Sequence, residues 1–63
     1  MDTDRLWHIA KIEARIETRR DYTSEDAAEY ENALPIIQAD DELDAEYNGI
    51  LEVIFDDLSI LDE

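Results

Sequence analysis

The sequence contains no cysteine, one glycine and one proline in its 63 residues. The absence of cysteine excludes disulfide bonds and thiolate metal sites. A single glycine excludes the glycine-rich loops that bind phosphate groups. Chains below about 70–80 residues usually need a disulfide, a metal, unusually good helix packing or a second subunit to be stable. We therefore expect a single domain over residues 1–63 that forms a homodimer or an obligate complex.

Basic residues are also scarce, and the last two-thirds of the chain has none. Residues 21–63 contain fifteen Asp and Glu and no Lys, Arg or His, whereas all five Lys and Arg lie within residues 1–20. The formal net charge is −14. Direct binding to nucleic acid or to an anionic membrane requires an excess of Lys and Arg, so we expect neither. The natural partner of this chain is a basic surface.

Long apolar runs are missing as well. No run approaches the roughly 18 residues that are needed to cross a membrane. The first residues, Met1-Asp2-Thr3-Asp4, are acidic where a signal peptide is basic. We expect a cytoplasmic protein.

The apolar residues that are present recur at the three- and four-residue spacing of helices. This pattern predicts an all-α fold of three helices, at about 4–20, 24–34 and 36–61. Thr3 is a candidate cap for the first helix, and Thr23 or Ser24 for the second. Pro35 is expected to end or kink a helix, or to begin the next one. Gly49 either divides the last helix or lies inside it.

Residues 10–18 permit an alternative, because apolar and polar residues alternate there as in a half-buried strand of an α+β fold. A helix over the same residues would place like charges such as Lys11 and Arg15 four positions apart. However, Ala, Lys, Arg and Glu favour helices over strands, and the sequence contains no convincing second strand. We therefore prefer a helix.

Patterns of catalytic and metal-binding residues are missing. The acids do not follow the alternating spacing of a calcium loop, and no Glu-x-x-His pair is present for a di-iron site. His8, Ser24 and Ser59 lack the context of a catalytic triad. We expect a protein that is not an enzyme and that needs no cofactor or metal.

The acids of the predicted second and third helices would form an anionic surface. Two helices of about 20 residues packed side by side would be roughly 30 Å long. Fifteen carboxylates over this length give about one charge per 2 Å, close to one per 1.7 Å in duplex DNA. The residues expected on the partner-binding surface are Glu29, Glu31, Asp40, Asp41, Glu42, Asp44, Glu46, Glu52, Asp56 and Asp57.

Other side chains have more local interpretations. Tyr30 and Tyr47 are expected to be half-buried with a solvated hydroxyl, and both are possible partner anchors. His8 is expected to pair with Asp4 on its own helix. The residues expected in the core or in a dimer interface are Leu6, Trp7, Ile9, Ile50, Ile54 and Leu58. The dimer is expected to form through the leftover apolar faces of Leu6, Trp7 and Ile9 and of the last helix. The bases expected to face the acidic helices are Arg15, Arg19 and Arg20.

With its base-free acidic segment, densest at Asp40, Asp41, Glu42, Asp44, Asp56 and Asp57, the chain resembles the small acidic inhibitors that phages and mobile elements make. These include anti-restriction and anti-CRISPR proteins that mimic DNA. The resemblance covers about two-thirds of the chain and consists of charge and size, without a shared motif. It implies stoichiometric inhibition of a basic nucleic-acid-binding protein in the host cytoplasm.

Two alternatives remain open at this point. An antitoxin or immunity protein would also be small and acidic, and it would cover a basic active site. An acidic adaptor or a halophile-type surface would carry its charge for solubility alone.

Overall fold

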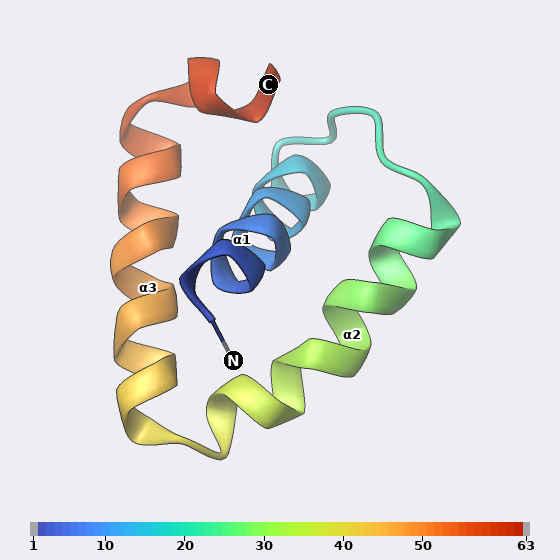
Figure 1. Ribbon diagram of the computed structural model, residues 1–63. Helices are drawn as coiled ribbons and strands as arrows, with labels where there is room; N and C mark the ends of the chain where they lie inside the picture. The colour runs from blue at the N-terminus through green and yellow to red at the C-terminus, as the bar shows by residue number, and fades with distance from the viewer. Residues whose placement is uncertain (1, 63) are drawn as a thin grey trace.

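The computed structural model describes residues 2–62, which form three α-helices and a short 3-10 helix (Figure 1). These elements are α1 (Thr3–Glu17), α2 (Ser24–Gln38), α3 (Asp41–Asp56) and η1 (Leu58–Asp62). No strand occurs within the described residues. The predicted all-α fold is confirmed, and the alternative of a strand at residues 10–18 is wrong because α1 occupies that stretch.

Helix α1 begins at Thr3, one residue earlier than expected, and ends before residue 20. Its N-cap is Asp2, whose carboxylate accepts a hydrogen bond from the backbone N–H of Arg5 at 3.1 Å, and Thr3 is already helical. The helix ends at Glu17, and Arg19 then adopts a left-handed conformation with φ of 59°. This left-handed residue lies where the chain leaves α1 toward α2, and its conformation is uncommon for a residue other than glycine.

Helix α2 continues through Pro35, so the expected end at residue 34 is wrong. It begins with a reciprocal capping box between Thr23 and Asp26 and ends at Gln38. A proline inside a helix costs about 3 kcal/mol. Ala33 and Ile37, on either side of Pro35, are both buried in the core. Burial of an isoleucine is worth about 1.5–3 kcal/mol, which offsets much of this cost.

The single last helix predicted over 36–61 is instead divided among three elements. Its first residues belong to α2, α3 covers the middle, and η1 follows. Asp40 caps α3 and accepts hydrogen bonds from the N–H groups of Glu42 and Leu43. Gly49 lies inside α3, at a cost of about 1 kcal/mol relative to alanine.

Helix α1 lies between the other two helices and contacts both (Figure 1). Helices α2 and α3 meet at a corner, at Ala39 and Asp40, and diverge from it on either side of α1. They do not form the side-by-side pair that the sequence led us to expect. The molecule is therefore a compact wedge of 28 × 25 × 17 Å rather than a rod.

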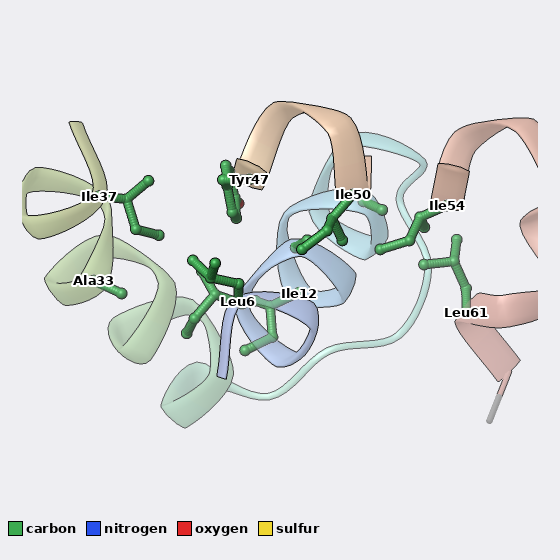
Figure 2. Close-up of a cluster of buried hydrophobic side chains, with 11 residues drawn as sticks. Leu6, Ile12, Ala33, Ile37, Tyr47, Ile50, Ile54 and Leu61 are labelled. Carbon is green, nitrogen blue, oxygen red and sulfur yellow. The ribbon is translucent and has the colours of Figure 1, made fainter. Parts of the chain in front are cut away.

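The core is a continuous row of side chains that joins all four elements (Figure 2). It runs from Ile37 of α2 past Leu6 of α1 and Tyr47 of α3 to Ile54 and Leu61. The residues predicted for the core or a dimer interface that lie in this core are Leu6, Ile9, Ile50 and Ile54. Leu6 and Ile9 are thus not left over for a dimer, because one chain buries them completely.

Candidate anionic interaction surface

The candidate site is the acidic face of α3, which we define as Asp41, Glu42, Glu46, Glu52 and Asp56. All five are exposed, and Asp44 of the same helix is half-buried. Helix α3 has 16 residues, six of them acidic and none basic. At 1.5 Å per residue it is about 24 Å long, which gives about one carboxylate per 4 Å. Along one strand of DNA, phosphates are spaced about 3.4 Å apart.

The acids at the start of α3 have a role in folding. Asp40 is the N-cap, and Asp41, Glu42 and Asp44 lie in the first turn. Negative charges there are stabilised by the unpaired N–H groups and by the helix dipole. The structure alone therefore accounts for the densest cluster of acids in the sequence.

The acids at the other end of α3 have no such explanation. Glu52 and Asp56 lie near the C-terminus of the helix, and the last turn contains no basic residue. Asp56 lies in the last turn, where an acid is destabilising by about 0.3–1 kcal/mol because the carbonyl end of the dipole is negative, and Glu52 lies one turn before it. Within residues 2–62 neither carboxylate forms a side-chain hydrogen bond or ion pair. Both are available to a basic partner.

Asp57 belongs to the same acidic end but serves the local turn. Its carboxylate accepts hydrogen bonds from the backbone N–H of Ser59 at 3.2 Å and from the Ser59 hydroxyl at 2.6 Å. These bonds stabilise the passage from α3 into η1. Asp57 is exposed, but its carboxylate is partly engaged within the chain.

The two predicted acids on α2 differ in their surroundings. Glu31 is exposed, whereas Glu29 is half-buried and contacts two side chains of α1. One Glu29 oxygen lies 3.0 Å from Arg5 Nη1, and the other lies 3.1 Å from His8 Nε2. His8 therefore pairs across helices with Glu29, and the expected pair with Asp4 is wrong. Glu29 stabilises the contact between α1 and α2 and is not a free surface charge.

The two tyrosines that were expected as partner anchors both point inward. Tyr47 is only 2% exposed, and within residues 2–62 its hydroxyl has no hydrogen-bond partner. Tyr30 is half-buried and donates its hydroxyl hydrogen to Glu13 at 2.8 Å. The expectation of a solvated hydroxyl is wrong for Tyr47, because its side chain is buried in the core between Ile37 and Ile50 (Figure 2).

Burial and negative charge shift the ionisation of these two tyrosines. Desolvation, followed by the hydrogen bond to Glu13, raises the pKa of Tyr30 to about 12. The pKa of Tyr47 is also raised, mainly by burial and then by the charge of Glu13. Both hydroxyls therefore stay protonated at neutral pH.

The basic cluster at the end of α1 lies beside η1. Arg15 donates from Nε and Nη2 to the backbone carbonyl of Leu61, at 3.4 and 3.1 Å. Arg19 is exposed and Arg20 is half-buried. The contact of Arg15 thus joins α1 to η1, rather than to the acidic face of α3.

Exposed apolar side chains accompany the acidic end of α3, and neither Val53 nor Phe55 was expected at the surface. Val53 is 49% exposed, Phe55 37% and Leu58 41%. Leu58 was expected in the core or a dimer interface. Successive residues of a helix point about 100° apart, so the triplet Val53-Ile54-Phe55 cannot all face inward. Only Ile54 is buried, and this arithmetic could have identified the other two.

Two shallow grooves flank Glu52 and Asp56. One is also lined by Asn48, Leu51 and Phe55, and the other by Gly49 and Val53. The free carboxylates thus lie on a ridge with apolar side chains on both sides. This arrangement suits a partner that combines positive charge with apolar contacts.

No group of three or more His, Asp or Glu side chains in residues 2–62 is placed to hold a metal ion. No helix in this part of the chain is long and apolar enough to cross a membrane.

No protein-family model, curated protein or solved structure matches this chain.

Proposed function

We propose that the protein is a stoichiometric inhibitor that presents the acidic face of α3 to the nucleic-acid-binding groove of a basic protein. The observation that carries this proposal is the pair of exposed, unpartnered carboxylates of Glu52 and Asp56 at the unfavourable end of a helix without bases. Folding alone gives no reason for acids at that position. A basic partner gives one, because its Lys or Arg side chains would neutralise both the carboxylates and the negative end of the dipole.

The charge spacing supports the same proposal. On average the acids of α3 occur about once per 4 Å along the helix axis, close to the one phosphate per about 3.4 Å that each strand carries along the axis of duplex DNA. Residues 21–63 carry no base that would repel a positively charged groove. Complementary charge accelerates association and is screened by salt, so binding should be fast at low ionic strength and weaken by about tenfold or more between 50 and 500 mM NaCl.

The proposal can be tested by capture and competition. The protein is immobilised, a bacterial lysate is passed over it, and the retained proteins are eluted with duplex DNA or RNA. The expected result is elution of proteins that bind nucleic acid. Retention of proteins that duplex DNA and RNA both fail to elute would contradict the proposal.

Charge reversal then locates the binding surface. The double variant Glu52→Lys, Asp56→Lys should lose capture while keeping its helical circular dichroism, because Lys at a helix C-terminus is favourable. The matched control is Glu17→Lys, Asp21→Lys, which makes the same change in net charge at two exposed positions outside α3. Equal loss in both variants would show that net charge, and not α3, determines binding.

A further inference from the structure

Gly49 lies in the middle of α3 although the fold does not require a glycine there. It is exposed and helical, and its φ is not positive. A Cβ atom added at this position would meet nothing within 4 Å. Glycine is disfavoured in helix interiors relative to alanine, so contacts within this chain do not explain its presence. One use of such a glycine is to let another backbone approach closely.

The surroundings of Gly49 indicate what could approach. Glu52, Val53 and Asp56 follow at the third, fourth and seventh positions, which places all four residues along one side of the helix. Together they line one shallow groove. Val53 is 49% exposed and offers an apolar contact beside two unpartnered carboxylates.

We propose that Gly49, Glu52, Val53 and Asp56 form a docking site for a basic α-helix of the partner protein. This inference rests on the proposed function, because it takes the partner to be basic. The partner helix would cross α3 over Gly49, pack an apolar residue on Val53, and place Lys or Arg side chains at Glu52 and Asp56. Helices pack with axes 8–10 Å apart, and the closest approaches require small residues at the crossing point.

The occupant is a basic helix for two reasons. A second copy of this chain packed symmetrically, α3 against α3, would bring the same carboxylates together, since residues 21–63 contain no base, and like charges across an interface are unfavourable. A helix also matches the proposed target, because many DNA-binding proteins insert a basic recognition helix into the major groove.

The test uses two synthetic helical peptides of equal charge, titrated into the full-length ¹⁵N-labelled protein. One peptide is built from Lys, Leu and Ala with its leucines on one face, and in the other Gln replaces Leu. Binding of the Lys/Leu/Ala peptide should shift the amide signals of residues 45–57, and the Lys/Gln/Ala peptide should bind at least about tenfold more weakly, as expected for an apolar contact. Equal affinity of the two peptides, or shifts spread over all acidic surfaces, would overturn the inference.

Substitution at Gly49 provides the decisive comparison. Gly49→Gln should retain the fold, because glutamine is the better helix former and its Cβ meets no neighbour. The same substitution should weaken binding of the Lys/Leu/Ala peptide by at least about tenfold. The matched control Ala28→Gln places the same side chain at an exposed position on α2 and should bind like the wild type.

If Gly49→Gln binds the peptide as tightly as the wild type, the inference is wrong. Displacement of nucleic acid from a partner by that variant would show that the proposed function still stands. If the peptide results are as expected but the protein displaces no nucleic acid from its partner, the helix-docking site is confirmed and the proposed function is wrong.

Discussion

At the scale of single residues, the cluster of Glu13, Tyr30 and Tyr47 shows that burial can be predicted from the sequence whereas hydrogen-bond partners cannot. Tyr47 lies in line with Leu43, Ile50 and Ile54, so its burial follows from the helical pattern. The hydrogen bonding of its hydroxyl does not follow from the pattern, because it depends on which side chains of α1 face α3. Tyr30 reaches Glu13, and within residues 2–62 the hydroxyl of Tyr47 has no hydrogen-bond partner.

This difference predicts opposite effects of two matched substitutions. Tyr47→Phe removes a buried hydroxyl without a partner and should leave the free energy of unfolding unchanged or raise it by about 1 kcal/mol. Tyr30→Phe removes a hydrogen bond to a carboxylate and should lower the free energy of unfolding by about 1 kcal/mol. Urea denaturation at pH 7 measures both. A larger loss for Tyr47→Phe than for Tyr30→Phe would show that the Tyr47 hydroxyl is bonded in the native state.

The raised tyrosine pKa values predict loss of stability at alkaline pH. Tyr30 has a pKa of about 12 in the folded protein, against 10.0 for an ordinary tyrosine. The folded state therefore holds this proton more tightly, so the stabilisation is complete below pH 10 and is lost as the pH rises from 10 to 12. Urea midpoints at pH 9 and 11.5 should differ more for the wild type than for the double variant Tyr30→Phe, Tyr47→Phe. Equal losses in both proteins would contradict this assignment.

At the scale of elements, the number and type of helices were predictable, but their ends were not. The ends depend on single side chains that compete for backbone groups. Asp40 caps α3, which separates it from α2, and Asp57 bonds to Ser59, which diverts the chain from α3 into η1. Pro35 was expected to interrupt the helix, but the burial of Ile37 offsets much of the local cost, and burial is a property of the assembled fold.

The placement of acids along α3 predicts opposite effects at its two ends. Glu52→Gln with Asp56→Asn removes unfavourable charges and should raise the free energy of unfolding by about 0.5–1 kcal/mol. Asp41→Asn with Glu42→Gln makes the same change in net charge at the favourable end and should lower it by a similar amount. Thermal denaturation at low salt compares the two. A change of the same sign in both variants would mean that net charge outweighs the dipole.

At the scale of the whole molecule, the sequence predicted an anionic surface but not its shape. The base-free segment is visible in the sequence, and most of the expected acids are exposed. The divergence of α2 and α3 could not be predicted, because it depends on how both pack against α1. The exposure of Val53 and Phe55 beside Glu52 and Asp56 follows from the helical spacing once Ile54 is assigned to the core.

The net charge of −14 predicts opposite effects of salt on folding and on binding. Screening weakens repulsion among the carboxylates, so the melting temperature should rise between 50 and 500 mM NaCl. The same screening should weaken binding to a basic partner. Differential scanning calorimetry and binding titrations in matched buffers measure the two trends. A melting temperature that falls with salt would contradict self-repulsion as the dominant long-range term.

The most direct test of the proposed function is competition for a captured partner. A fluorescent duplex DNA or RNA is bound to that partner at 150 mM NaCl, and its anisotropy is followed as the protein is added. We predict that about one equivalent returns the anisotropy to the value of the free duplex, and that the variant Glu52→Lys, Asp56→Lys needs at least about tenfold more. Anisotropy that stays constant or increases while the protein binds would reveal a ternary complex and contradict inhibition by occupation of the nucleic-acid groove.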